Sequence, residues 1–269
     1  MATEAGSSLR ARIAGVAVVG PGMDDWAGAQ SLLIVGTQAP LPLTRIAAPD
    51  GLPPAERRRV GSVVKLALSA GLAACREAGV DPADPGTVFA SSGGDGDNCH
   101  AICEGLAGSD RLISPIRFHN SVSNAASGYW GIATGSRACS SVLSAYDGSF
   151  AGGLIEAFAL LATDKRPVLL IAYDHPYPSP LAETRPLGPP FAVALLLDRS
   201  DAESGPRLTL GAIGMEPATT LDDAPLEALR RSVPAARSIP LLSRLARGTA
   251  GRVALDYLDG LTLEIELEP

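Results

Sequence analysis

The chain has 269 residues and a mass of 27.5 kDa, and its 22 basic and 29 acidic side chains give a formal net charge of −7. Hydrophobic residues make up 46% of the sequence, which supports a sizeable core and argues against disorder as the main state. The chain is acidic, lacks a long Lys/Arg run and has no apolar stretch near the ~20 residues of a membrane span. We therefore expect neither nucleic-acid binding nor membrane insertion.

The N-terminus and the cysteines bear on the compartment. Residues 1–20 contain an early Glu4 and lack the apolar core of a secretion signal, so we expect a cytoplasmic protein with reduced thiols. Cys99, His100 and Cys103 form a cluster, but a zinc site usually needs a fourth ligand. We expect small buried thiols at a helix start there, with no metal and no organic cofactor.

Strand-like and helix-like segments alternate along the chain, which predicts an α/β layer fold in one domain spanning residues 1–269. Apolar periodicity and Gly/Pro breakers delimit the elements of the first half. In order they are a strand, an irregular excursion, a helix, a short buried strand and two helices: 12–19, 23–55, 55–78, 87–91, 98–106 and 118–133.

The second half continues the alternation and ends in a different pattern. Residues 216–250 are predicted to form a polar, partly helical insertion, and residues 251–268 a C-terminal hairpin. The dipeptide Asp259-Gly260 predicts a type I′ turn between the two hairpin strands. The elements before the insertion are a strand, a helix and three further strands: 137–145, 148–163, 167–173, 191–198 and 207–214.

The most informative stretch is 114–156, where the predicted strand 137–145 leads into a sharp turn at Ala145-Tyr146-Asp147 and a small-residue helix follows. A helix N-terminus offers unpaired N–H groups and a partial positive charge. A nucleophile at such a turn has a lowered pKa, and an adjacent oxyanion is stabilised. The pattern is therefore typical of a catalytic elbow.

Several separate segments resemble one known family, and they occur in that family's order. They are RRRVGSVVKLALSAGLAAC, VFASSGGDG, HNSVSNAASGYWGIATG, PVLLIAYD and PPFAVALLLDR. Together they resemble the N-terminal half of the β-ketoacyl synthases, and the whole length is similar to the short chain-length-factor-like proteins of aryl polyene biosynthesis. The resemblance implies a thiolase-like half-fold, a layered mixed sheet with helices on both faces.

The departures from the family decide the expected function. A ketosynthase needs a thiolate at the elbow and two histidines from its second half to support decarboxylation and bind the oxyanion. Counting back from strand 167–173 puts Asp147 at the elbow, with Tyr146 as the alternative if the register shifts by one. No histidine follows His175. We therefore expect no catalytic residue and no condensation by this chain alone.

Two residues near the elbow allow alternative interpretations. Cys139 lies in a string, Ala138-Cys139-Ser140-Ser141, that resembles a ketosynthase nucleophile motif. However, the residues after Cys139 are typical of a continuing strand. We therefore expect Cys139 to be a small buried strand residue and keep a nucleophile as the alternative. Asp147 is expected to cap the following helix, with shaping of an acyl tunnel as the alternative.

Two further motifs are expected to be structural. Gly93-Gly94-Asp95-Gly96 lacks the lysine of a phosphate-binding loop and is expected to be a tight strand-to-helix crossover. Arg57-Arg58-Arg59 is expected to lie on a solvated helix face, and the alternative is a docking patch for an acidic acyl carrier protein.

A half-ketosynthase with small-residue helices has an apolar face that a second subunit would normally cover. We therefore predict a non-catalytic chain-length-factor subunit that pairs with a full-length β-ketoacyl synthase and uses an acyl carrier protein, in aryl polyene, polyketide or fatty-acid-type elongation. The interface is expected near residues 117–145. His119 and Asn120 also suit a hydrogen-bonded structural role, and Tyr129 and Trp130 also suit a core role. The expected members of the interface are His119, Asn120, Tyr129, Trp130, Arg137 and Ser141.

Two other functions remain open at the level of sequence. One is a stand-alone acyltransferase or thioesterase that uses Cys139 as its nucleophile. The other is a homodimeric binding module that kept the fold and lost the pathway. Reactivity of Cys139 would favour the first, and a stable homodimer that ignores any ketosynthase would favour the second.

Overall fold

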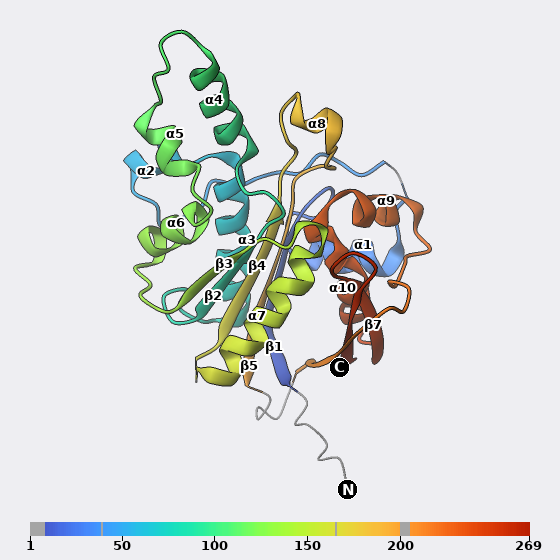
Figure 1. The fold of residues 1–269 in the computed structure, drawn as a ribbon. Coiled ribbons are helices and arrows are strands. Elements are labelled where there is room, and N and C mark those ends of the chain that lie inside the picture. The colour runs from blue at the N-terminus through green and yellow to red at the C-terminus, as the bar shows by residue number, and fades with distance from the viewer. Residues whose placement is uncertain (1–8, 39, 165, 200–204) are drawn as a thin grey trace, which may run out of the picture.

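A computed structural model describes residues 9–38, 40–164, 166–199 and 205–269, so the expectation about the extreme N-terminus lies outside the described residues (Figure 1). One eight-stranded mixed sheet runs through the molecule in the order β3-β2-β4-β5-β1-β6-β8-β7. β2 is parallel to β3 and β4, and the other pairs are antiparallel. The strands are β1 Arg10–Val19, β2 Gly86–Ala90, β3 Ser140–Leu143, β4 Val168–Asp174, β5 Phe191–Arg199, β6 Arg207–Gly214, β7 Gly251–Asp256 and β8 Thr262–Glu268.

Helices cover both faces of this sheet, as predicted (Figure 1). α3 and α6 pack on one face, while α7, α1 and the segment from α9 to α10 pack on the other. The helices are α1 Trp26–Val35, α2 Pro54–Arg59, α3 Ser62–Ala78, α4 Gly96–Ala107, α5 Pro115–Asn120, α6 Ala125–Thr134, α7 Ser149–Thr163, α8 Leu181–Thr184, α9 Ala224–Ser232 and α10 Ile239–Arg247, with the short 3₁₀ helices η1 Tyr146–Gly148 and η2 Pro234–Ser238.

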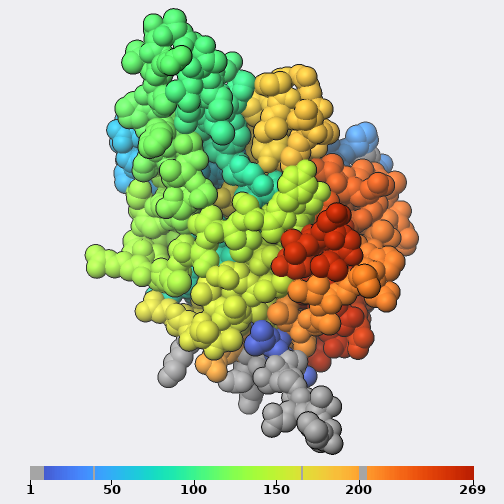
Figure 2. All heavy atoms as spheres, in the orientation of Figure 1, coloured from blue at the N-terminus to red at the C-terminus, as the bar shows by residue number. Residues whose placement is uncertain are grey.

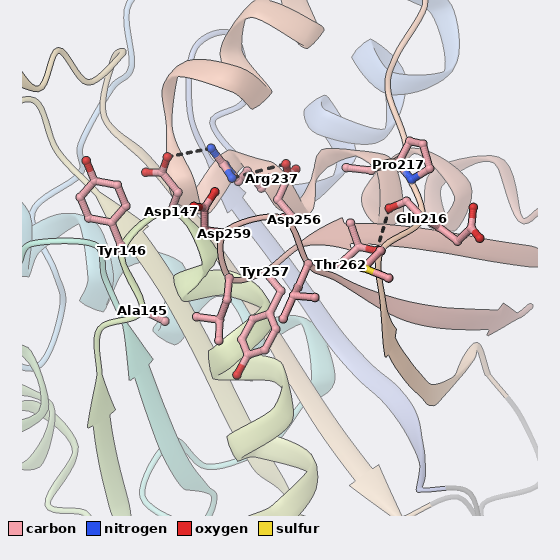
Figure 3. A pocket seen from close by; sticks show the side chains of 15 residues that line it. Ala145, Tyr146, Asp147, Glu216, Pro217, Arg237, Asp256, Tyr257, Asp259 and Thr262 are labelled. Carbon is pink, nitrogen blue, oxygen red and sulfur yellow. Dashed lines mark hydrogen bonds and ion pairs between the residues drawn. The ribbon is translucent and has the colours of Figure 1, made fainter.

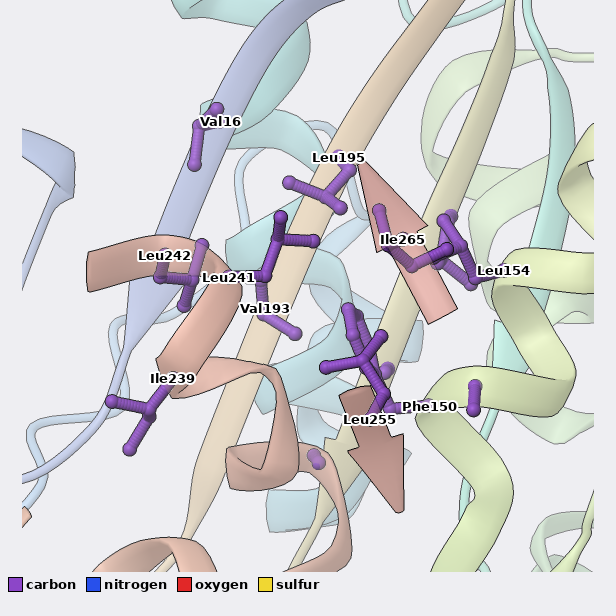
Figure 4. Packing of buried hydrophobic residues seen from close by; sticks show 14 of the residues in the cluster. Val16, Phe150, Leu154, Val193, Leu195, Ile239, Leu241, Leu242, Leu255 and Ile265 are labelled. Carbon is purple, nitrogen blue, oxygen red and sulfur yellow. The ribbon is translucent and has the colours of Figure 1, made fainter. Parts of the chain in front are cut away.

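The central strands are buried on both faces because of this layering. Every residue of β4 is buried, and its side chains alternate between the α3 side and the α7 side. Figure 4 shows the α7 side, where Phe150 and Leu154 of α7 belong to one cluster with Leu241 of α10 and with Val193 and Leu195 of β5. A strand buried on both faces reads as an unbroken apolar run, which explains why β4 and β5 were predicted close to their true limits.

Gly71 allows α3 to pack closely against Trp130 of α6 and against the sheet. A Cβ atom on Gly71 of α3 would lie 2.6 Å from Ile171 Cδ1 and 2.7 Å from the ring of Trp130. Only glycine leaves room for both neighbours at this point of the helix. Trp130 is therefore fixed between α3 and the sheet, with its ring centroid 6.2 Å from that of Phe89.

Three of the expectations about helices were wrong. Residues 23–55 were expected to be irregular, yet α1 forms there because the Asp25 side chain caps it by accepting a hydrogen bond from the Gly28 N–H at 2.7 Å. The predicted helix 55–78 is interrupted at Val60-Gly61, giving α2 and α3. The predicted helix 118–133 is two helices, α5 and α6, so His119 and Asn120 end a helix instead of opening one.

The C-terminal elements also differ in detail from the prediction. Residues 216–250 are partly helical as expected, but their apolar side chains enter the core of the α7 face, since Leu226, Leu229 and Leu242 are buried there. β7 and β8 form the predicted antiparallel hairpin. Gly260 has a φ of 70°, whereas Asp259 is not among the described residues with positive φ, so the turn is not of type I′.

Candidate functional site

The predicted elbow lies between β3 and α7, and its strained residue is Tyr146. The φ of Tyr146 is 51°, a conformation that a non-glycine residue adopts only when its surroundings impose it. The Ser149 hydroxyl donates to the Tyr146 carbonyl at 2.7 Å and accepts from the Ala145 N–H at 3.0 Å, which fixes the turn. The residue at the elbow is thus the one expected if the register shifted by one, and Asp147 follows it.

Asp147 does not cap α7, so that expectation was wrong. The cap position is Gly148, and no side chain caps the helix. The Asp147 carboxylate instead accepts hydrogen bonds from two guanidinium groups, Arg185 and Arg237, each at 2.9 Å. Two full positive charges attract a carboxylate more strongly than the partial charge of a helix end.

The ion pairs continue away from the elbow as a network (Figure 3). Arg237 Nη1 lies 3.4 Å from Asp256 Oδ1 on β7. Asp256 also pairs with Arg230 of α9, which is held in turn by Glu227. The network therefore ties the elbow to η2, to the C-terminal hairpin and to α9.

Arg185 makes a second contact with the elbow. Its guanidinium carbon lies 3.4 Å from the centroid of the Tyr146 ring, which is a close cation–π geometry. Burial lowers the pKa of Arg185, but the Tyr146 side chain and the charge of Asp147 outweigh that effect and raise the pKa above its usual value. The exposed phenol ring, 63% accessible, is thus covered on one face by a permanent cation.

Two hollows meet at Tyr146. One is a cavity of about 760 Å³, the elbow cavity, which Asp147, Arg237 and the hairpin residue Tyr257 also line (Figure 3). The other is a groove of about 610 Å³ between α4 and the α8 loop, lined by Cys99, Cys103, Leu181 and Arg185 among others. Tyr146 lines both.

Glycines allow the walls of these hollows to approach. A Cβ atom on Gly148 would collide with the Tyr257 carbonyl oxygen, so the hairpin tip rests directly on the elbow. Likewise, Cβ atoms on Gly93 or Gly96 would collide with Tyr177, which lines the groove. The predicted tight crossover at residues 93–96 therefore allows Tyr177 to pack against the backbone between β2 and α4.

Cys139 is exposed, so the prediction of a buried strand residue was wrong. It immediately precedes β3, and its carbonyl oxygen accepts a hydrogen bond from the Thr87 N–H at 2.9 Å. A strand follows it instead of a helix, as predicted, so no helix N-terminus activates its thiol. The structure thus separates Cys139 from the elbow by the length of β3.

The remaining cysteines and the histidines are distributed over the surface and core. Cys99 and Cys103 are exposed on α4, contrary to the expected burial, and His100 pairs with Glu104 at 3.4 Å. Cys75 is buried, and this burial raises the pKa of its thiol to about 12. The elbow cavity has no histidine among the residues that line it in the described part of the chain.

Three of the six residues predicted for an interface are buried within this chain. The Tyr129 hydroxyl donates to Asn120 Oδ1 at 2.9 Å, and Asn120 Nδ2 donates to the Arg59 carbonyl at 2.8 Å. With Trp130, they anchor residues 96–134 (α4, α5 and α6, hereafter the arm) to α2 and α3. Because these three side chains are buried, they can support the outer surface of the arm but contribute little area to a contact with a partner.

The other three lie at the surface. His119 and Arg137 are exposed, and Ser141 on β3 is half-buried with its hydroxyl donating to Glu156 at 2.8 Å. β3 is an edge strand of the sheet, so one side of it has no partner strand among the described residues.

Large apolar side chains are exposed along the arm. Figure 2 shows the arm rising above the rest of the molecule. Leu112 is 81% and Phe118 is 62% exposed. Singly exposed apolar residues are common, but a series on one projecting element is typical of an interaction surface. The series is Leu106, Leu112, Ile113, Ile116, Phe118, Val122 and Ile132.

The described residues contain no group of three His, Cys, Asp or Glu side chains close enough to hold a metal ion. Within the same residues, no helix has both the length and the hydropathy to cross a bilayer.

Arg185 and Arg237 were not identified from the sequence. They lie 38 and 90 residues from Asp147 along the chain, and neither belongs to a motif. The only available signal was the lone acidic residue at the predicted elbow, which does not say which cations reach it.

Comparisons with known proteins bear on the family and the fold of the chain. The family model of the β-ketoacyl synthase N-terminal domain matches residues 25–251. A search of the curated proteins found no match.

Solved structures resemble the chain over nearly its whole length. A chain from the complex of the ketosynthase ApeO with its chain length factor ApeC, from Xenorhabdus doucetiae, is 22% identical with a TM-score of 0.72, covering 96% of this chain and 99% of that one. The ishigamide ketosynthase/chain length factor has 15% identity and a TM-score of 0.71, with 96% and 99% covered. AntDE:AntF, a type II PKS acyl-carrier protein in complex with its ketosynthase bound to the hexaketide, has 12% identity and a TM-score of 0.72, with 97% and 99% covered.

Proposed function

Because this chain belongs to the family of the β-ketoacyl synthase N-terminal domain, we propose that it is a chain-length-factor subunit that pairs with a catalytic β-ketoacyl synthase. The observation that carries the proposal is Tyr146 at the strained elbow, where the family's mechanism requires a thiolate. A phenol is a weaker nucleophile than a thiolate and does not serve as the acyl carrier of this mechanism. The chain therefore does not load and condense acyl groups by itself.

The arm and the free edge of β3 are the proposed contact surface for the ketosynthase. In ketosynthase-like dimers the strand before the elbow meets its counterpart across the dimer axis, and β3 is that strand here. Pairing of an edge strand satisfies its open N–H and C=O groups, and the apolar side chains of the arm lose their exposure to water. The similar structures that contain a ketosynthase with its chain length factor support pairing with a ketosynthase.

A second partner of the proposed complex is an acyl carrier protein. Arg57, Arg58 and Arg59 are exposed on α2, and Arg117 is exposed on the neighbouring α5. Only Arg59 forms an ion pair with an acidic residue of that helix, Glu56 at 2.9 Å. Because acyl carrier proteins are acidic, this local positive charge would steer them to an otherwise acidic chain. We place the complex in the cytoplasm and in aryl polyene, polyketide or fatty-acid-type elongation.

The proposal is tested by co-expressing the chain with the full-length ketosynthase of its native host. We expect the two proteins to co-purify as a heterodimer. We also expect the pair to extend a thioester-linked primer, and the length of the product to change when this chain is replaced by a related subunit. Each subunit is assayed alone as a control. Elongation by this chain without a partner, or a stable homodimer that binds no ketosynthase, would contradict the proposal.

A further inference from the structure

Arg185 is the residue through which the α8 loop reaches the elbow. It follows α8 directly, and its backbone N–H donates to the Leu181 carbonyl at 2.9 Å, which closes the α8 turn. Its guanidinium lies over the Tyr146 ring and pairs with the Asp147 carboxylate. One side chain therefore joins a surface loop to both consecutive residues of the elbow.

Tyr146 and Arg185 form the boundary between the two hollows. Among the residues described, Tyr146 is the one that lines both the elbow cavity and the groove, and Arg185 lines the groove beside it. The stacked ring and guanidinium therefore stand at the one described residue that the two hollows, of about 760 and 610 Å³, share.

The backbone conformation of Tyr146 is imposed by its neighbours. A tyrosine at a φ of 51° is strained, and such a residue persists only where its neighbours hold it. Asp147 supplies part of that restraint, because its two oxygens are bound by Arg185 from the α8 loop and Arg237 from η2. Loss of Arg185 would remove the stacking partner of Tyr146 and one of the two cations of Asp147.

We propose that Arg185 is a latch that keeps Tyr146 in place as a closed gate between the elbow cavity and the groove. When the latch is released, the α8 loop and the Tyr146 ring move and the two hollows become one passage. The gate is a property of this chain alone. Its use as a stop for a growing apolar chain rests on the proposed function.

The chain carries its own reporters for the gate. Cys99 and Cys103 are exposed at the wall of the groove, so their labelling rates depend on how much room the groove leaves for a bulky reagent, and Cys139 is exposed outside the groove and serves as an internal reference. The isolated protein is treated with fluorescein-5-maleimide, a bulky thiol reagent, and the rate at each cysteine is measured by peptide mass spectrometry. The readout is the rate at Cys99 and Cys103 divided by the rate at Cys139, which cancels general changes in reactivity.

Arg185→Met is expected to raise this ratio about fivefold, since it removes both an ion pair and a cation–π contact. Arg185→Lys keeps the charge opposite Asp147 but loses the flat guanidinium, so we expect about a twofold rise. Arg45→Met is the matched control, because Arg45 is exposed and pairs only weakly with Asp24 at 3.7 Å, and it should leave the ratio unchanged.

An unchanged ratio in folded Arg185→Met, with cooperative thermal unfolding, would overturn the latch. If that variant does not fold, the wild-type protein is labelled in low and high salt instead. Salt weakens a part-exposed ion pair, so the ratio should rise with ionic strength, and a constant ratio would overturn the proposal. Both measurements use the chain without a partner, so a failure to bind a ketosynthase does not affect them.

Discussion

The elbow end of the molecule and the arm differ in how their side chains are satisfied. At the elbow, Asp147 is bound by two arginines, and the hairpin tip packs against Gly148. On the arm, the inner side chains such as Trp130 are buried, but the outer ones such as Phe118 face water. The charged groups of the elbow are thus paired within the described residues, whereas the outer side chains of the arm form an exposed apolar surface.

The largest expected effect concerns the inner side of the arm. Trp130→Ala should lower the free energy of unfolding by about 3–5 kcal/mol, because it leaves a cavity between α3 and the sheet. Urea denaturation followed by circular dichroism measures it. The control is Ile132→Ala on the same helix, which is 46% exposed and should change stability by less than about 0.5 kcal/mol. Equal losses in both variants would contradict the distinction between the two sides of the arm.

The outer side of the arm should affect binding and not stability. Phe118→Ser removes an exposed aromatic side chain, so the unfolding free energy should stay within about 0.5 kcal/mol of wild type. Affinity for the partner ketosynthase should fall about tenfold or more, as expected for an aromatic anchor of an interface. Titration calorimetry with the purified partner measures it. Unchanged affinity in Phe118→Ser and Ile116→Ser would move the proposed contact surface elsewhere.

A smaller effect is expected at the elbow. Asp147→Asn leaves Arg185 and Arg237 without their shared negative charge and should reduce stability by about 1 kcal/mol. Thermal unfolding at low ionic strength measures it, and high salt should reduce the difference. Asp24→Asn is the control, since its exposed pair with Arg45 should contribute nothing measurable. A large binding defect in Asp147→Asn would show that the elbow also contacts the partner.

A further expected effect, of a different kind, is a dependence of stability on pH near the elbow end. Burial raises the pKa of Asp174 to about 6, even though it accepts hydrogen bonds from Ser92 and Ala235. Because the folded protein holds this proton more tightly than the unfolded chain, the contribution of Asp174 to stability is fully present below the ordinary carboxyl pKa of 3.8 and is lost as pH rises through about 6. Unfolding free energies at several pH values measure it, and Asp174→Asn should remove this component of the slope.

The elements that were predicted well are those whose burial is simple. β4 and β5 are covered on both faces, so an unbroken apolar run was enough to identify them. Residues 216–250 were expected to be a polar insertion, yet leucines among them, such as Leu226, Leu229 and Leu242, are buried on the α7 face of the sheet. Composition averages over a segment, whereas packing depends on which side chains face the core.

At the candidate site, the sequence predicted the turn, and tertiary contacts determined which side chains surround it. The turn at residues 145–147 was predicted from a strand followed by a small-residue helix, and both neighbours are present. Backbone strain, however, distinguishes Tyr146 from Asp147, and a one-residue register cannot be read from apolar runs. The expected burial of Cys139 failed for a related reason, since β3 is shorter than predicted and lies at the sheet edge.

By itself the sequence determined the fold class, the order of the central strands and helices along the chain, and the lack of any histidine after His175. Those features follow from local periodicity and from composition, which need no knowledge of distant neighbours. Only the tertiary structure brought Arg185 and Arg237 to Asp147 and set Tyr146 between two hollows. Such contacts join residues far apart in the chain, and their partners depend on how the sheet and its layers pack.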